Sequence, residues 1–442
     1  MVWSGAAGGI DRTVPIRLRI LQPLYLVHGI FAGYGFVTAI FYWLDLNGIR
    51  PVGIGGGSVP GAVAGAAEAQ RYYVLAHAAL ASGLIMGGQT RRIRQFRFSW
   101  DGSTAGLLLL VSGVASLGSI VMGYVPGMGQ LETVLSRLGF VAGASSFGPS
   151  LAGSGRAWFP VSLVLNLIFL ALAIASGWKE EVIVWLVLVG LGTFPFFPKL
   201  TLILGPSLFL GSLVFLPLMS NVVRQLSWGG DVSKTVAVET GIRVIAGSSS
   251  EEIIEATWDF ATGRLSESSM FVRYIDSVNQ GTPREGLSIL RQSLLAPVPR
   301  ILWPAKPILE TMVMQRVYDH GVVSDLSAVS AKPHPVVDAY LVGGALGIIG
   351  CFLCLGLLGS WAFAFCRDHF GGMFLGGVFF NGLFSMLWRG NAFEFMAATL
   401  FWSVAVAFGI HCLLQASGFS RSVTSKTRPR LSRTGSITSP DQ

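Results

Sequence analysis

The chain has 442 residues, of which 52% are hydrophobic and only 12% are charged, and its mean hydropathy is +0.62. Soluble domains carry about 25% charged residues, so this composition excludes an ordinary soluble enzyme. The net charge of +8 comes from short basic clusters beside apolar runs, a pattern that indicates membrane orientation rather than nucleic-acid binding. The four cysteines lie in or at the ends of apolar runs, which predicts neither a disulfide framework nor a zinc site.

Nine apolar runs approach the length of about 20 residues that a helix needs to cross a bilayer. They cover residues 21–44, 72–88, 105–122, 158–177, 182–197, 200–220, 339–366, 370–388 and 395–414. The glycine- and proline-rich residues 51–67 between the first two runs are predicted to form a loop.

A weaker segment over residues 138–155 is predicted to be a tenth span. Nine crossings with a cytoplasmic N-terminus place 9 Lys and Arg inside and 11 outside when the long loop is excluded, against the positive-inside bias. The uncharged, small-residue segment between Arg137 and Arg156 changes this split to 15 inside and 5 outside if it crosses. Small residues suit a helix that packs tightly within a bundle. The sequence therefore predicts an all-α polytopic membrane protein with about ten transmembrane helices and both termini cytoplasmic.

These spans divide the chain into four parts. Residues 1–220 form an N-terminal bundle of about seven spans, 221–337 a large, partly helical extracytoplasmic loop, and 338–414 a C-terminal three-span bundle. Within the loop, helical periodicity occurs at 251–261, 266–279 and 284–295. Residues 415–442 form a basic cytoplasmic tail that has too few apolar residues to build a core and is predicted to be disordered.

A proline-rich segment follows the predicted helical part of the loop. Four prolines among residues 296–307 forbid a regular helix and hold Arg300, Trp303 and Lys306 in fixed directions. Such a set can bind a sugar–pyrophosphate, because arginine contacts phosphate bidentately and tryptophan stacks on a sugar face. A rigid linker is the alternative interpretation.

Polar residues also border the C-terminal spans. His334 and Asp338 lie at the start of the span at 339–366, where the helix dipole favours an anion. Arg389 and Glu394 lie at the hydrocarbon boundary between the last two spans, where a charge is costly unless it is paired or functional. The alternatives are a loop histidine for His334, a cap-region aspartate for Asp338, and either interfacial snorkelling or a simple ion pair for Arg389 and Glu394.

One local pattern resembles a known family. It consists of residues 299–307 (PRILWPAKP), the serines within residues 327–330, and residues 338–347 (DAYLVGGALG). This run is similar to the P-R-x-x-x-P-x-K-P, serine, E-x-Y and G-x-x-G pattern of bacterial polysaccharide repeat-unit polymerases of the Wzy type. The chain has Asp338 where many relatives have Glu, which keeps the carboxylate but shortens its reach. The resemblance covers chiefly residues 264–394.

The resemblance implies a GT-C-like fold and a glycosyl transfer that needs neither a metal nor another cofactor. The reaction would take place on the outer face of the bacterial inner membrane. A sugar hydroxyl of one undecaprenyl-pyrophosphate-linked repeat unit would attack the anomeric carbon of a growing glycan, and undecaprenyl pyrophosphate would leave. The implied partners are the lipid-linked donor and acceptor, membrane lipids, a chain-length regulator and a flippase, but no nucleic acid.

The same resemblance implies roles for particular residues. His334 or Asp338 would be the catalytic base that accepts the hydroxyl proton. Cationic side chains would stabilise the charge that develops on the leaving pyrophosphate, and Trp303 would support the sugar. The substrate-binding candidates are Arg273, Arg300, Lys306 and Arg389, with Arg264 and Glu394 in a secondary position.

Three alternatives remain open at this point. An O-antigen ligase would use the same donor, a polysaccharide flippase or transporter would move it, and a structural subunit would serve an export complex. The sequence contains no P-loop, GxSxG, HExxH or DxD-like motif, which argues against an ATP pump or a cytoplasmic sugar-nucleotide transferase. Carboxylates are nearly missing from the predicted spans, which disfavours ion-coupled transport.

Overall fold

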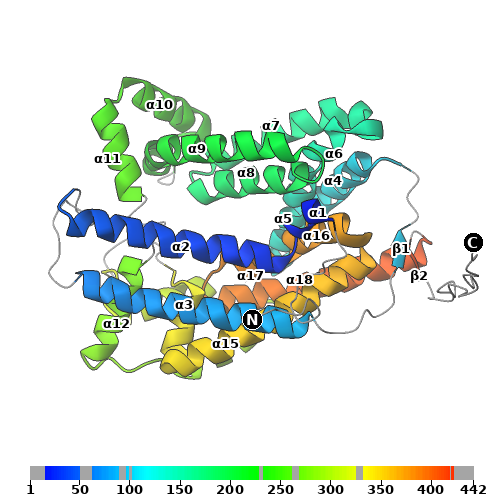
Figure 1. Ribbon diagram of the computed structural model, residues 1–442. Helices are drawn as coiled ribbons and strands as arrows, with labels where there is room; N and C mark the ends of the chain where they lie inside the picture. Colours follow the sequence, from blue (N-terminus) through cyan, green and yellow to red (C-terminus); the bar gives the residue numbers. More distant parts are fainter. Residues whose placement is uncertain are drawn as a thin grey trace, which may run out of the picture.

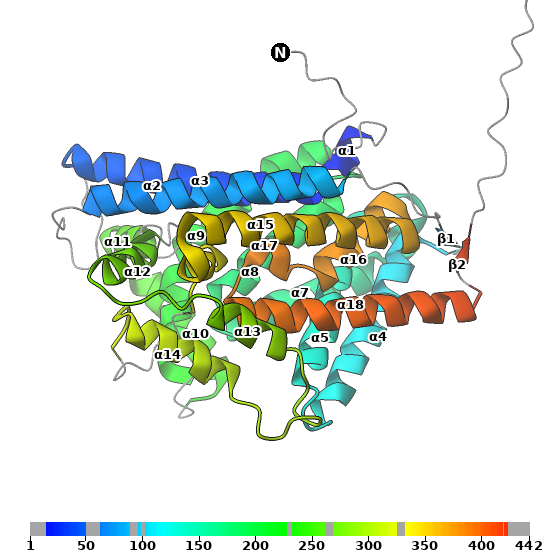
Figure 2. The ribbon, with the colours of Figure 1, turned by 90° about the horizontal axis from the view of Figure 1, so that it is seen from below.

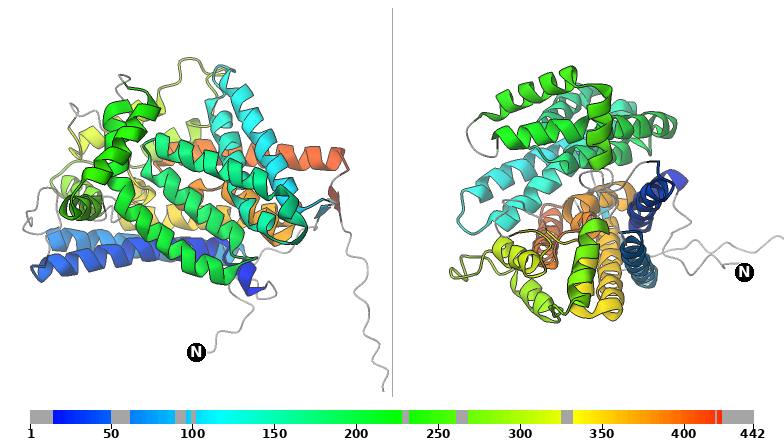
Figure 3. Two further views of the ribbon diagram at one scale, coloured as in Figure 1. Left: turned by 90° about the horizontal axis from the view of Figure 1, so that it is seen from above. Right: turned by 90° about the vertical axis from the view of Figure 1, so that its left-hand side faces the viewer.

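The computed structural model describes residues 15–49, 62–88, 96–98, 102–227, 232–260, 268–324, 332–418 and 420–422. Regular structure within these ranges is helical apart from two three-residue strands, β1 (Phe96–Phe98) and β2 (Ser420–Ser422), which pair antiparallel. Figure 1 shows the helices in layers: α7, α8 and α9 lie on one side and α3 and α15 on the other, with α5 and α16 between them. Figure 3 shows the same layering end-on.

Six helices are long and apolar enough to cross a membrane. They are α2 (Pro23–Leu46), α4 (Thr104–Gly123), α7 (Phe159–Ala175) with the turn before it, α9 (Pro198–Ser227), α15 (Pro335–His369) and α18 (Phe393–Ala416). Helices also occupy the other predicted spans, as α3 (Ala62–Gly87), α5 (Gly129–Ser145), α8 (Lys179–Thr193) and α16 (Gly372–Leu383). Each of the ten predicted segments therefore contains a helix, and six of the helices have the length and composition of a span.

The segment at 138–155 is not the single straight helix that was predicted. Helix α5 ends at Ser145, and the chain continues as the short helices α6 (Phe147–Leu151) and η1 (Gly153–Trp158). Pro149 explains the break, since it cannot donate a hydrogen bond to the Ser145 carbonyl and its ring would clash there. Tight packing of small residues is confirmed, because a Cβ atom on Gly148 would lie 2.3 Å from the Gly192 carbonyl oxygen.

Helices α3 and α15 pack with their backbones in direct contact. A Cβ atom on Gly83 would lie 2.3 Å from the Leu353 carbonyl oxygen, and one on Gly356 would lie 2.3 Å from the Leu80 carbonyl oxygen. Glycine thus permits the close approach that small residues give helices in membranes. Nearer its start, α15 kinks at Gly344, whose φ of 61° suits glycine.

The region between α9 and α15 folds over the bundle. Helices α10 (Lys234–Gly247) and α11 (Ser250–Phe260) pack on α9, α12 (Ser268–Asn279) packs on α3, and α13 (Ser288–Leu295) and α14 (Leu309–Asp319) pack on α18. Figure 2 shows α11, α12 and α14 at the end of the molecule opposite β1 and β2. Helices therefore occur where the loop's periodicity predicted them, although α13 starts later than expected.

The C-terminal tail departs from its prediction near its start. Helix α18 continues to Ala416, and Ser420–Ser422 form β2, in which Arg421 pairs with Arg97 of β1. The prediction of disorder from residue 415 onward is therefore wrong for these residues. Residues 423–442 lie outside the described part of the chain.

Candidate functional site

Three predicted site residues lie in one region, where the turn before α18 contacts the start of α15. Gly390 lies over His334, because a Cβ atom at Gly390 would be 3.1 Å from His334 Nε2. The backbone N–H of Phe393 donates to Asp338 Oδ2 over 2.8 Å. Glu394 follows directly and is fully buried. His334, Asp338 and Glu394, which the sequence singled out separately, thus belong to one site.

Arg316 on α14 joins the two carboxylates of this site. Its Nη1 and Nη2 atoms donate to Glu394 Oε1 and Oε2 over 2.9 and 3.1 Å, and Nη2 lies 3.1 Å from Asp338 Oδ1. The exposed fraction is 3% for the Arg316 side chain and 0% for both carboxylates. Burial alone would lower the pKa of Arg316, but Asp338 and Glu394 together raise it. The result is a buried cluster with a bidentate ion pair that ties α14 to α15 and α18.

Two further polar side chains line this cluster. The Tyr274 hydroxyl is buried and makes no hydrogen bond to any other described residue, and burial together with Asp338 raises its pKa. The ring of His320 lies 5.3 Å from that of Tyr274, and its Nδ1 atom is 3.1 Å from Ser277 Oγ. Burial lowers the pKa of His320, so this side chain is neutral at pH 7. These two neutral side chains therefore border the charged cluster.

His334 lies beside a small apolar pocket. The pocket has a volume of about 20 Å³, room for about one water molecule, and is lined by Phe31, Leu80, Phe352 and Met396 among others. Burial lowers the pKa of His334 to about 3, so the imidazole is neutral at pH 7. In the described part of the chain, no group of three or more His, Cys, Asp or Glu is placed to hold a metal ion.

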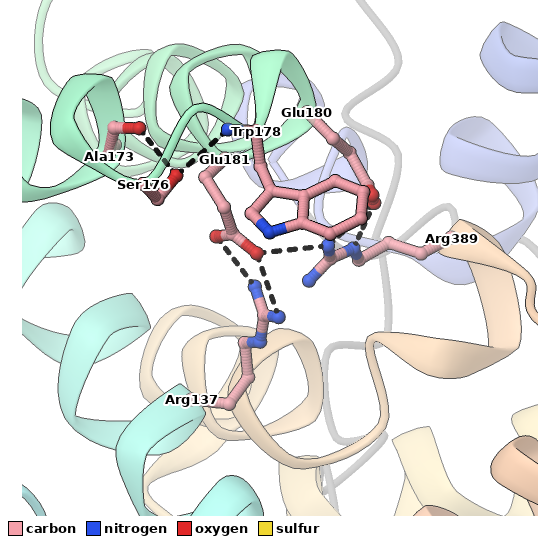
Figure 4. A network of polar contacts seen from close by, with 7 residues as sticks. All are labelled: Arg137, Ala173, Ser176, Trp178, Glu180, Glu181 and Arg389. Carbon is pink, nitrogen blue, oxygen red and sulfur yellow. Dashed lines mark hydrogen bonds and ion pairs between the residues drawn. The ribbon is translucent and has the colours of Figure 1, made fainter. Parts of the chain in front are cut away.

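Arg389 turns away from Glu394 and toward α8. Its Nη2 atom lies 2.6 Å from Glu180 Oε1 and 3.3 Å from Glu181 Oε1. Glu181 also accepts two hydrogen bonds of 3.2 Å from Arg137, as Figure 4 shows. The alternative of an Arg389–Glu394 pair is therefore wrong. Any anionic ligand of Arg389 must compete with these two carboxylates.

The proline-rich segment separates its three predicted residues by environment. It is non-helical, as its prolines predicted. Lys306 is buried and donates through Nζ to the carbonyl oxygens of Ala296 and Val298. Trp303 is partly buried, whereas Arg300 is exposed. Of the two cations predicted here, Arg300 alone presents its charge to the surroundings.

The remaining candidates lie elsewhere. Arg273 donates through Nη1 to the Val322 carbonyl over 2.7 Å and so links α12 to the turn after α14. Arg264 lies outside the described residues. The described substrate-binding candidates therefore occupy four places, namely the proline-rich segment, the α8 network, the α12–α14 contact and, for Glu394, the Arg316 cluster.

Sequence reasoning missed the residues that organise the site. Arg316 is one of 11 basic residues in the long loop, and its partner Glu394 is 78 positions away, so no local pattern marks it. Glu180 and Glu181 follow a predicted span, a signal that could have suggested pairing with another boundary charge. Arg137, which borders the predicted tenth span, pairs with Glu181 across 44 positions, so no local pattern marks this pair either.

Comparison with known families adds one result. A family model described as a domain of unknown function, DUF8712, matches residues 1–420. The chain belongs to the DUF8712 family. Its match runs through both helical bundles and the region between them, so these parts form one family unit. No curated protein and no solved structure matches the chain.

Proposed function

We propose that this protein is an integral-membrane glycosyltransferase that polymerises undecaprenyl-pyrophosphate-linked repeat units into O-antigen or exopolysaccharide. The observation that carries the proposal is the surface around Arg300. This exposed guanidinium stands beside Ile301 and Leu302, which are 64% and 76% exposed. A polyprenyl pyrophosphate has the matching combination of an anionic head and an apolar tail, and arginine is suited to bidentate contact with its phosphates.

The proposed reaction forms one bond and breaks one. The hydroxyl oxygen of the acceptor sugar bonds to the anomeric carbon of the donor glycan, and the bond from that carbon to the pyrophosphate oxygen breaks. The leaving pyrophosphate takes the electron pair and is stabilised by Arg300. The hydroxyl proton passes to Asp338 or to the neutral imidazole of His334. Because Arg316 encloses Asp338, this assignment requires α14 to shift when the acceptor binds.

The proposal also places the protein in the bacterial inner membrane, with ten crossings, a GT-C-like fold and cytoplasmic termini. Two contacts support this topology. Strand pairing joins Arg97 to Arg421, both expected inside. The network of Arg137, Glu181 and Arg389 joins three residues expected outside.

The test uses a strain that lacks its own copy of the gene. We expect Arg300→Ala, at normal protein level, to lose long glycan and to accumulate single lipid-linked units. The matched control is Arg291→Ala, another exposed arginine from the same region, which should give a full glycan ladder. A full ladder from Arg300→Ala would show that polymerisation does not need Arg300 and would contradict the observation that carries the proposal.

The alternatives give different products. Loss of a ligase leaves long lipid-linked polymer, whereas loss of a flippase leaves repeat units on the cytoplasmic face. Purified protein that converts lipid-linked units into polymer in detergent would support the polymerase and contradict both a flippase and a structural subunit.

A further inference from the structure

We infer that the apolar side chains of residues 287–308 re-enter the membrane and contact the hydrocarbon of its outer leaflet, although this segment belongs to the region predicted to lie outside it. This inference rests on the proposed topology but not on the proposed activity. The segment exposes apolar side chains to an unusual degree, with exposed fractions of 42–80%. These side chains are Leu287, Leu294, Leu295, Ile301, Leu302 and Ile308. A cluster of this kind marks a binding or membrane surface rather than an aqueous one.

Three backbone carbonyls of the segment find their hydrogen-bond donors in protein side chains rather than in water. Prolines leave the carbonyls of residues 296–298 outside any helix, yet all three accept hydrogen bonds from side chains. Gln130 donates to the first over 3.2 Å and Trp402 to the second over 3.3 Å. Lys306 donates to the first and to the third, over 2.8 Å in the latter case. Non-helical backbone is tolerated at membrane depth only when its polar groups are satisfied by protein in this way.

One partner of these carbonyls, Trp402, indicates the depth of the segment. Trp402 lies nine residues after Phe393, the first residue of α18, which corresponds to about 13 Å along the helix. Helix α13 packs along α18 as well, and Figure 2 shows the two side by side. The segment thus runs beside the middle of a helix that is long and apolar enough to cross the membrane.

The exposed face continues a second membrane helix. A Cβ atom on Gly127, in the turn after α4, would lie 3.0 Å from the backbone nitrogen of Ile301. On α4 and in that turn, Leu117 and Tyr124 are 63% and 85% exposed. The apolar face of the segment and that of α4 therefore form one surface. Arg300 is exposed at its edge, where its stem can lie in hydrocarbon and its guanidinium can reach lipid phosphates. The partner is thus a phospholipid leaflet.

The first experiment uses the unmodified full chain in phosphatidylcholine vesicles. A hydrocarbon-soluble diazirine is photolysed, and labelled peptides are located by mass spectrometry. We expect label in residues 294–302 at a yield within about threefold of that in residues 114–121 of α4, because both face acyl chains. Label in α4 but none in residues 287–308 would overturn the inference.

A second experiment measures depth directly. Leu302→Cys is introduced after the four native cysteines are replaced by alanine, and a nitroxide is attached. Val114→Cys on α4 serves as the lipid control, and Gln280→Cys after α12 serves as the aqueous control, since both positions are exposed. We expect the nitroxide at 302 to collide with oxygen and with a water-soluble nickel chelate as the one at 114 does. Collision rates that equal those at 280 would place the segment in water and contradict the inference.

Discussion

Replacing Arg316 tests whether the buried charge cluster holds the outer helices to the bundle. Arg316→Met removes three contacts of 2.9–3.1 Å and leaves two carboxylates, each with 0% exposure, without their cation. Breaking a buried ion pair by removing one partner costs about 3–5 kcal/mol, because the remaining charge cannot be solvated. We therefore expect the ratio of folded to unfolded protein to fall about 10²- to 10⁴-fold. Titration of the purified protein with SDS in mixed micelles, followed by circular dichroism, measures this change.

Two further variants separate lost charge balance from lost packing. Arg291→Met removes an exposed arginine and should change the free energy of unfolding by less than about 0.5 kcal/mol. A triple variant adds Asp338→Asn and Glu394→Gln to Arg316→Met, which neutralises the cluster and should recover more than half of the loss. The reasoning is refuted if Arg316→Met is as stable as Arg291→Met, or if the triple variant is no more stable than Arg316→Met alone.

Three other predictions concern single side chains. Burial lowers the pKa of His334 to about 3, below its unfolded value near 6.5, so protonation favours unfolding and stability falls as the pH drops through 6.5. The slope is at most about 1.4 kcal/mol per pH unit, and the difference between wild type and His334→Gln in SDS titrations from pH 7.5 to 5 should show it. Lys306→Met leaves buried carbonyls without a donor, so we expect a loss of about 1–3 kcal/mol and faster proteolysis within residues 296–307; an unchanged cleavage rate would contradict this role. Gly356→Val forces α15 away from the Leu80 carbonyl, so the thermal midpoint should fall well below that of Gly350→Val, at whose Cβ position nothing lies within 4 Å.

Most helices were predictable because their signal is local. A run of apolar residues must leave water whatever surrounds it, which placed helices in nine predicted segments, and the balance of charges indicated the tenth. The interruption after α5 was also encoded locally by Pro149, but the high content of small residues obscured it. The lengths of the helices were less predictable, since α5 and α8 extend only 17 and 15 residues.

The site was predictable only in part, because the contacts between its residues are not local in the sequence. Asp338 and Glu394 attracted notice because charges are rare at the hydrocarbon boundary, and the structure brings both to one guanidinium. That this guanidinium is Arg316, rather than Arg389, depends on how α14 packs against α18. A side chain's partner is a property of the whole fold, and the two arginines are equally charged in the sequence.

The low share of charged residues in the sequence determined that the protein is built of apolar helices, because hydrocarbon tolerates few charges. The prolines of residues 296–307 determined that this segment is not helical. Only the tertiary structure decided which charges of the site neutralise one another, because the pairs of Arg316 with Glu394 and of Arg389 with Glu180 join elements far apart in the chain. It also decided that Lys306, Gln130 and Trp402 satisfy the carbonyls of the proline-rich segment. Hydrogen bonds of that kind exist only after the helices have packed.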